Sequence, residues 1–379
     1  MKHLFYIGLV GLLLFEIANV YFIMPMPGSQ RTNSLDLAYF LYTWRWGFRA
    51  LFGLLVIIGA VSAFRGSKWV ALTMVVLVAV ISYAFNFRMA ADHMFYQPGH
   101  LQLKGGNQNV VKLNREVLGI NVNGQAKAYP IQYIGYHHQV LDTINNQPVM
   151  ITYCTVCRTG RAFRPVVNGQ VETFRLVGMD HFNAMFEDAT TGSWWRQANG
   201  EAIAGQLTGT TLPEVFSEQM TLKQWLALHP KSLIMQPDTI FNERYVKMDT
   251  YERGKGSSEL TQRDSLSWRD KSWVIGVKMG NKTKAYDWNQ LKRERLIHDT
   301  LANRPVLLAL MSDNRSFFVY ERPTLRAHFI LQHDTLFIGN SAYALTGKAL
   351  GSGQDLNRIP AYQEFWHSWR TFHPGTRRY

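Results

Sequence analysis

Two cysteines, the only two in this chain of 379 residues, stand three positions apart in Cys154-Thr-Val-Cys157. Such a CxxC pair brings two sulfurs within reach of one metal ion or of each other, because two intervening residues let the chain turn back. His137 and His138 stand shortly before the pair. Three interpretations therefore remain open: a structural disulfide, a redox-active dithiol, and a soft-metal site for zinc or copper completed by an imidazole.

Several other chemistries lack their motifs. A covalently attached haem requires His directly after the second cysteine, where this chain has Arg158, and thioredoxin-like proteins place CxxC at a helix N-terminus, whereas Thr159-Gly160 leads into a predicted hairpin. The sequence contains no Walker A loop, no G-x-S-x-G elbow and no H-E-x-x-H. A polymer-processing enzyme using Glu187, Asp188 or Glu201 is a weaker hypothesis, because single carboxylates are normally surface residues.

The part of the chain that carries the cysteines contains an internal repeat. Val117 to Val149 aligns without gaps with Val274 to Val306 at an offset of 157, and ten of 33 positions are identical. A later match, at an offset of 144, aligns Trp225-Leu-Ala-Leu-His-Pro230 with Trp369-Arg-Thr-Phe-His-Pro374. The sequence therefore predicts two tandem related domains.

The repeat also serves as an internal control, because residues kept in both copies are explained by the shared fold. His229 and His373 occur in both copies and are expected to pack or cap a helix. In contrast, the cysteines align with Met311 and Asn314 of the second copy, and the two histidines align with Glu294 and Arg295. The candidate redox or metal residues confined to one copy are Cys154, Cys157 and His137, with His138, His181, Met179 and Met185 as further candidate ligands.

The elements expected in each copy are short strands, hairpins and short helices. Asn-Gly or Gly-Asn pairs at 123–124 and 280–281 indicate hairpins, and buried strands follow at 148–153 and 305–310. The segments before His229-Pro and His373-Pro have helical spacing of apolar residues. The predicted class is α+β, mainly antiparallel sheet, with a first repeat at 89–236, a linker or exposed loop at 237–272, and a second, degenerate repeat at 273–379.

Three apolar stretches precede the repeats within residues 1–88. They run from Leu4 to Met24, from Gly47 to Phe64 and from Trp69 to Phe87, each near the ~20 residues that cross a bilayer. We predict a three-helix transmembrane anchor rather than a cleaved signal peptide, since two more spans follow the first. Glu16 would lie near mid-membrane, and Arg49 is its expected partner in an internal ion pair.

Charges flanking these spans predict their orientation. Lys2, Arg65 and Lys68 favour a cytoplasmic N-terminus and a cytoplasmic loop between the second and third spans. Arg45 lies at the opposite end of the second span, where a long side chain can snorkel to the interface. The predicted location is the cytoplasmic membrane of a bacterium, with both soluble domains in the periplasm.

The overall charge limits the partners. Lys and Arg number 40 against 27 Asp and Glu, but no run of five basic residues and no nucleic-acid motif occurs. The expected partners are the lipid bilayer and other subunits of a membrane complex, with no nucleic acid.

The residues around the CxxC pair resemble the DUF3179 family, a bacterial and archaeal group of unassigned function. The resemblance rests on Ala128-Tyr-Pro130, a histidine corresponding to His137, Asp142-Thr143 and Pro148-Val through Thr152-Tyr-Cys-x-x-Cys157. It continues through Thr173-Phe174, Asn183, Asp188, Thr191-Gly-Ser193, Trp195 and Gly200-Glu-Ala-Ile-Ala-Gly205, and it covers about residues 115 to 235. His181 is an addition particular to this sequence. The resemblance strengthens the motif and implies no activity.

Two functional hypotheses follow. The first is a membrane-anchored extracytoplasmic protein with a thiol-redox or soft-metal site on the first repeat. The second is a non-catalytic subunit or scaffold of a cell-envelope membrane complex, with a structural disulfide and with exposed aromatic residues used for packing or partners.

Overall fold

A computed structural model describes residues 1–256 and 258–379, which form two compact units. The N-terminal unit contains residues 1–96, 172–196 and 201–211. The C-terminal unit contains residues 97–171, 197–200 and 212–379. Part of the segment that carries the family-like motif, including His181, therefore belongs with the N-terminal helices.

Three helices of the N-terminal unit have the length and composition of membrane-spanning segments. They are α1 (Lys2–Tyr21), α3 (Arg45–Gly66), and α4 (Lys68–Tyr83) with its π-helical continuation Ala84–Arg88. Gly59 lets α3 approach α1 closely, because a Cβ there would lie 2.3 Å from the backbone nitrogen of Phe5. Two shorter helices accompany these spans: α2 (Leu35–Thr43) lies between α1 and α3 in the chain, and α5 (Ala91–Met94) follows the third span. The expected apolar helical region at the N-terminus is confirmed.

A four-stranded sheet completes the N-terminal unit. Its order is β12-β11-β10-β9, with bounds Ala202–Ala204, Trp194–Arg196, Asn183–Asp188 and Phe174–Asp180. The amide of Met179 on β9 donates to the carbonyl oxygen of Ile23 at 2.7 Å, and a Cβ on the neighbouring Gly178 would lie 2.4 Å from that oxygen. Glycine at 178 thus permits the sheet to dock on the segment that follows α1.

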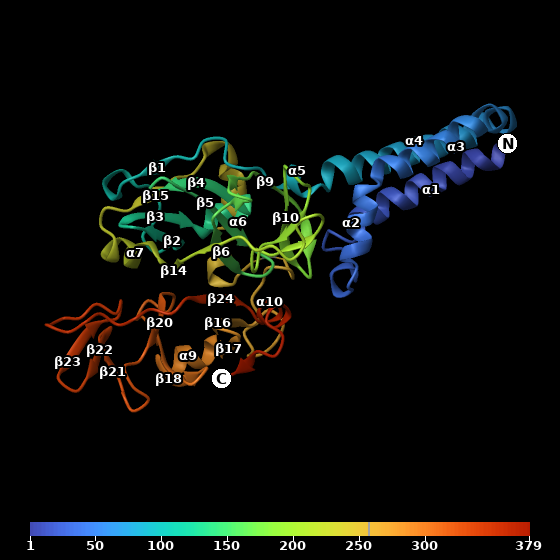
Figure 1. Cartoon of the computed structure of the whole chain (residues 1–379). Helices are drawn as coiled ribbons and strands as arrows, with labels where there is room; N and C mark the ends of the chain where they lie inside the picture. The colour runs from blue at the N-terminus through green and yellow to red at the C-terminus, as the bar shows by residue number, and fades with distance from the viewer. Residues whose placement is uncertain (257) are drawn as a thin grey trace. The chain divides into compact units, whose positions relative to one another are not determined.

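The first half of the C-terminal unit consists of two sheets and two short helices (Figure 1). The five-stranded sheet has the order β1-β15-β3-β2-β14, with bounds Leu103–Lys104, Leu233–Met235, Gln125–Pro130, Glu116–Val122 and Ser217–Thr221. The four-stranded sheet has the order β13-β6-β5-β4, with bounds Glu214–Val215, Thr159–Phe163, Gln147–Cys154 and Gln139–Ile144. Its helices are α6 (Ile131–His137) and α7 (Leu222–Leu228).

The second half follows a polar segment that contains α8 (Asn242–Lys247). One sheet has the order β24-β16-β17-β25, with bounds Ala361–Phe365, Trp273–Met279, Lys282–Asp287 and Arg377–Arg378. Another has the order β18-β19-β20, with bounds Leu296–Leu301, Arg304–Leu310 and Phe317–Glu321. The helices are α9 (Trp288–Glu294) and α10 (Trp366–Phe372), and a small β21-β22-β23 sheet covers Ile330–Gln332, Thr335–Ile338 and Ser341–Ala344. Two-residue strands β7 (Val166–Val167) and β8 (Gln170–Val171) pair in the first half, at the expected Asn168-Gly169 turn.

The strand registers of the two halves correspond residue by residue. Gly119 pairs with Ala128 between β2 and β3, and the positions 157 residues later, Gly276 and Ala285, pair between β16 and β17. Both glycines lie under a tryptophan of a later short helix. A Cβ at Gly119 would lie 2.3 Å from the ring of Trp225 on α7, and a Cβ at Gly276 would lie 2.1 Å from the ring of Trp369 on α10. The same turns and the same glycine–tryptophan contact thus recur in both halves.

The observed class is α+β with many antiparallel sheets, as the hairpin signals and apolar strands predict. The core of the second half is built from inward-facing strand residues such as Ile275, Leu308 and Val319, with Trp288 of α9 packed among them. The two halves contact each other where β24 of the second half lies against β6 of the first.

Candidate functional site

The CxxC pair occupies the hairpin turn between β5 and β6. Cys154 is the last residue of β5 and pairs with Thr159, the first residue of β6. Arg158 closes the turn with φ +54°, a left-handed conformation that is uncommon for a residue with a side chain. Both thiols are completely buried, and the carbonyl oxygen of Cys157 accepts a 2.9 Å hydrogen bond from the amide of Phe365. The turn is therefore covered by the second half of the unit.

Two side chains from outside the first repeat complete the surroundings of the thiols. His367 of α10 places Nε2 3.8 Å from Cys157 Sγ. Lys271, in the segment before β16, donates from Nζ to the carbonyl oxygens of Val156 and Leu260, both at 2.6 Å. These contacts tie the lysine to the CxxC turn itself.

Burial controls the protonation of these groups. It raises the pKa of the Cys157 thiol well above its usual value, and the hydrogen-bonded Cys154 thiol adds to this rise. Burial also lowers the pKa of Lys271 to about 8, against the opposing attraction of the two cysteines. The pKa of His367 falls to about 4, mainly through burial and secondarily through Lys271. At neutral pH Cys157 is therefore a thiol and the His367 imidazole is neutral.

The two histidines predicted from the sequence lie at the end of α6. His137 Nε2 is 2.7 Å from the hydroxyl oxygen of Tyr245 on α8. His138, in a left-handed conformation just after α6, places Nδ1 2.8 Å from the carbonyl oxygen of Tyr153 on β5. Burial lowers the pKa of His138 to about 4. The His138 ring is thus bonded to the CxxC strand itself, and the His137 ring to α8.

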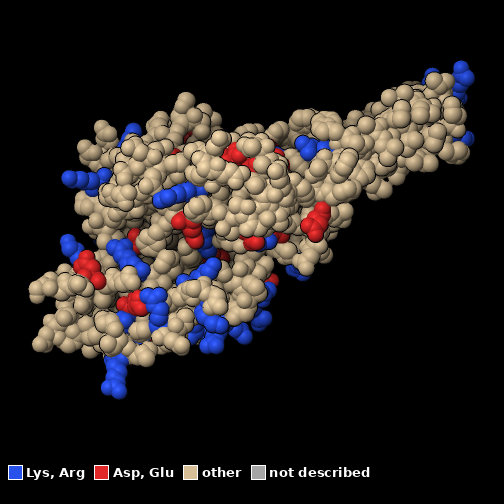
Figure 2. Space-filling model, in the orientation of Figure 1, with Lys and Arg blue, Asp and Glu red and all other residues tan. Residues whose placement is uncertain are grey.

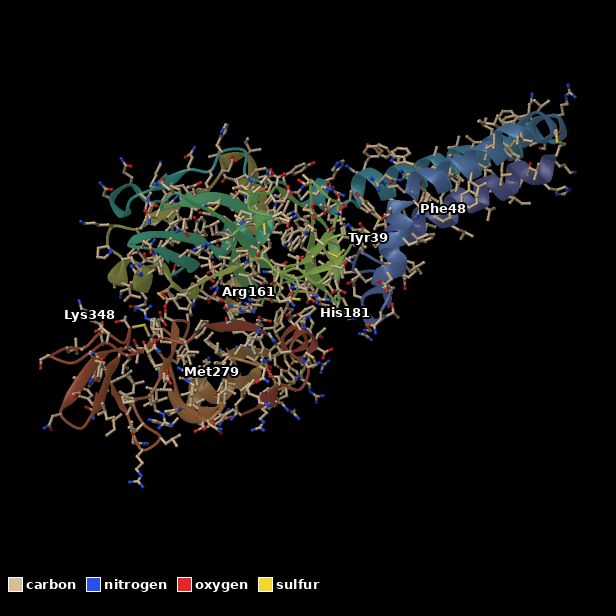
Figure 3. The ribbon with its side chains drawn as sticks, viewed as in Figure 1. Tyr39, Phe48, Arg161, His181, Met279 and Lys348 are labelled. Carbon is tan, nitrogen blue, oxygen red and sulfur yellow. The ribbon has the colours of Figure 1, made fainter. Side chains whose placement is uncertain are left out.

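The remaining candidate ligands belong to the N-terminal unit. Met179 lies on β9 and Met185 on β10. His181, labelled in Figure 3, lies in the turn between these strands, with Nδ1 2.6 Å from Asp180 and Nε2 3.0 Å from Asn33. The structure therefore distributes the predicted ligands over both units.

Within residues 1–256 and 258–379, no three or more His, Cys, Asp or Glu side chains are arranged to hold a metal ion.

Buried arginines beside the cysteines join the two halves. Arg158 Nη2 donates to Glu116 of β2 at 2.9 Å, and its Nε donates to Gln363 of β24 at 2.8 Å. Its guanidinium lies 3.8 Å from the ring centroid of Trp273. Arg161, labelled in Figure 3, forms a buried ion pair with Glu364 of β24. The CxxC hairpin is consequently fixed to the second half by charged groups as well as by backbone bonds.

An ion pair with a bidentate geometry lies among the three apolar helices. Arg49 of α3 donates from Nε and Nη2 to the two carboxylate oxygens of Glu16 on α1, at 2.8 and 3.0 Å. Asn86 donates to the same carboxylate at 2.8 Å and accepts from Arg49 at 2.6 Å. One residue from each apolar helix thus contributes to a closed polar network.

A comparison with family models matches residues 104–376 to the family described as "Protein of unknown function (DUF3179)". The chain belongs to the DUF3179 family. The match extends beyond the stretch that the sequence motifs cover and includes both halves of the C-terminal unit. Comparisons with curated proteins and with solved structures find no match.

Sequence reasoning on this DUF3179 chain missed two neighbours of the thiols, His367 and Lys271. The sequence did contain a signal for His367. At the offset of 144 residues found for the later part of the repeats, His367 aligns with Lys223 rather than with another histidine. It is therefore a reactive residue confined to one repeat, as the cysteines are. Lys271 had no comparable signal, since it lies in the polar segment expected to be a linker.

Proposed function

We propose that this DUF3179 protein is a membrane-anchored thiol–disulfide redox protein, with Cys154 and Cys157 as its redox couple. The observation that carries this proposal is the complete burial of both thiols in one hairpin turn, where Cys154 ends β5 and Cys157 follows three residues later. A pair held in this way can form an intramolecular disulfide with only local movement. Oxidation releases two protons and transfers two electrons to a partner disulfide, which becomes two thiols.

Burial gives the couple a specific reactivity. A thiol with a raised pKa holds little thiolate, so it reacts slowly with general oxidants. Exchange therefore requires the turn from Cys154 to Arg158 to become accessible, and the covering residues from the second half, such as Phe365, determine when this happens. The proposed function is therefore a buried redox couple that reacts when the turn becomes exposed, rather than a solvent-accessible catalytic dithiol.

A soft-metal site is the second candidate, and one distance favours it. Two ligands bonded to one zinc or copper ion at ~2.3 Å for sulfur and ~2.1 Å for nitrogen are separated by roughly 3.5–4 Å. Cys157 Sγ and His367 Nε2 are 3.8 Å apart. In this alternative, His367 joins His137 as a candidate for the imidazole ligand.

Thiol titration in defined redox buffers distinguishes these functions. Full-length protein in detergent is equilibrated with mixtures of reduced and oxidised glutathione, quenched in acid, alkylated and analysed by mass spectrometry. We expect a reversible Cys154–Cys157 disulfide that disappears in Cys154→Ser. Thiols that never oxidise, together with one equivalent of copurifying zinc or copper, would favour the metal site. A disulfide that resists reduction would favour the structural role in an envelope complex.

We infer further that the two halves of the C-terminal unit arose by duplication of one domain. Matching registers at an offset of 157 and the repeated glycine–tryptophan contact support this inference. The first repeat carries the thiols, and the second supplies His367 and the hydrogen bond from Phe365. A redox site at the boundary between the repeats gives the second copy, which has no cysteine, a role at that site.

The proposed location is the periplasmic side of a bacterial cytoplasmic membrane, with the N-terminus in the cytoplasm. Labelling of single introduced cysteines in a Cys154→Ser, Cys157→Ser background tests this topology. Ser257 lies outside the described residues, so the label is placed at the exposed Glu259, with exposed Ser67 between α3 and α4 as the opposite-side control. A membrane-impermeant maleimide should reach position 259 and not position 67 in cells with a permeabilised outer membrane. The reverse pattern would place the thiols in the cytoplasm.

A further inference from the structure

We infer that Cys157 is the attacking sulfur of the couple, that His367 accepts its proton, and that Lys271 offsets the charge that develops on it. This assignment rests on the proposed redox function and names its reacting atom and its two assisting side chains. The two assisting residues come from outside the first repeat. The substrate class is a disulfide.

The orientation of the His367 ring supports its role as a proton acceptor. Its Nδ1 lies 3.0 Å from the carbonyl oxygen of Asp270, and a carbonyl can only accept, so Nδ1 carries the hydrogen. The other nitrogen, Nε2, then presents its lone pair, and it is the atom 3.8 Å from Cys157 Sγ. A nucleophile, a base and a third group that orients the base form the arrangement expected for an activated thiol.

The backbone holds this ring in place. The amide of His367 donates to the same Asp270 oxygen at 3.0 Å, and the ring lies nearly parallel to that of Phe365, at an angle of 26°. Phe365 in turn donates its amide hydrogen to the Cys157 carbonyl. The imidazole and the thiol are thus positioned by one connected set of contacts.

Lys271 provides a positive charge beside the same turn. Its two bonds to carbonyl oxygens hold Nζ next to Val156, the residue before Cys157. Carbonyl oxygens are neutral, so a buried ammonium bound to them gains further from an adjacent anion. A thiolate at Cys157, the residue after Val156, supplies that anion.

The proposed exchange balances in two steps. Cys157 sulfur attacks one sulfur of a disulfide RSSR, its proton passes to His367 Nε2, and a mixed disulfide forms while RS⁻ leaves. Cys154 then attacks the Cys157 sulfur, forming the Cys154–Cys157 disulfide and releasing the second RS⁻. The two departing thiolates take the two protons from the protein, so RSSR is reduced to two RSH.

Reaction with 4,4′-dithiodipyridine, a disulfide that releases a coloured thione, tests the assignment. Full-length Cys154→Ser protein in detergent should trap one mixed disulfide on Cys157. In this background, His367→Phe and Lys271→Met should each slow its formation at least tenfold, and Lys271→Arg should restore most of the rate. The matched controls are His373→Phe, at the end of the same helix, and Lys278→Met, an exposed lysine; both should react within twofold of the parent.

The outcomes separate this inference from the redox proposal. Equal rates in parent, His367→Phe and Lys271→Met protein would overturn the inference, as would faster modification of Cys154 in Cys157→Ser than of Cys157 in Cys154→Ser. Repeating the reaction in 6 M guanidinium, where the rate differences should vanish, shows that these differences depend on the folded site. A merely structural effect is recognised by failure of Lys271→Arg to restore the rate. If wild-type protein never forms the Cys154–Cys157 disulfide in any glutathione mixture, the redox proposal itself fails.

Discussion

Replacing Arg158 by methionine tests whether the buried arginine joins the two halves of the C-terminal unit. Its side chain is 1% exposed, and the carboxylate of its partner Glu116 is 2% exposed. Methionine fills most of the volume, but it leaves Glu116 without its hydrogen-bonded cation and removes one of the two donors to Gln363. Removing one partner of a buried pair costs about 3–5 kcal/mol, because the remaining charge stays buried.

Arg315 provides a matched control, since it occupies the position 157 residues after Arg158 in the second half. It is partly exposed and donates to the carbonyl oxygen of Asn114. Arg315→Met should therefore lower the free energy of unfolding by about 1 kcal/mol or less. With about 2–4 °C per kcal/mol for a domain of this size, we expect Arg158→Met to lower the unfolding midpoint by roughly 6–20 °C and Arg315→Met by less than about 4 °C.

The assay is thermal unfolding of the full chain in detergent, followed by tryptophan fluorescence and circular dichroism. The double variant Arg158→Met, Glu116→Gln should be more stable than Arg158→Met alone, because the uncompensated buried charge is removed as well. Equal losses for Arg158→Met and Arg315→Met, or no recovery in the double variant, would refute the role assigned to Arg158. The polar network would then contribute to specificity without contributing to stability.

Three further predictions address other parts of the chain. Gly119→Ala should lower the free energy of unfolding by about 1–3 kcal/mol, because the new methyl group would lie 2.3 Å from the ring of Trp225 and overlap it. The same thermal unfolding assay measures this change, and unchanged stability would contradict the close contact. The hydrogen bond to Asp180 raises the pKa of His181, so the stability that it contributes should be complete below pH ~6.5 and disappear as pH rises through the folded-state pKa. An NMR titration checks this, and in Asp180→Asn the His181 titration should shift down; an unchanged midpoint would disprove the pairing. Glu16→Leu, which leaves Arg49 without its carboxylate among apolar helices, should lower the unfolding midpoint more than Glu16→Gln does, since the amide still accepts a hydrogen bond.

The sequence by itself determined the local elements of this DUF3179 protein. Apolar stretches of about bilayer length predicted the three N-terminal helices, because a helix that crosses lipid must be apolar over that length. The expected turns at 123–124 and 280–281 lie between paired strands, since Asn and Gly adopt the left-handed conformations that such turns require. These features follow from neighbouring residues, so a pattern within a short window was sufficient to predict them.

Tertiary structure alone decided which side chains surround the thiols. Cys157 and His367 are 210 positions apart in the sequence, and only the packing of α10 against the CxxC turn brings them to 3.8 Å. Packing of α6 against α8 likewise brings His137 Nε2 to 2.7 Å from the hydroxyl oxygen of Tyr245, which lies 108 positions later in the sequence. Likewise, β9 to β12 follow the cysteines closely in the chain, yet they belong to the unit of the N-terminal helices. The physical reason is that the contacts between distant segments depend on how whole sheets and helices pack, and a local pattern of residue types contains no measure of that packing.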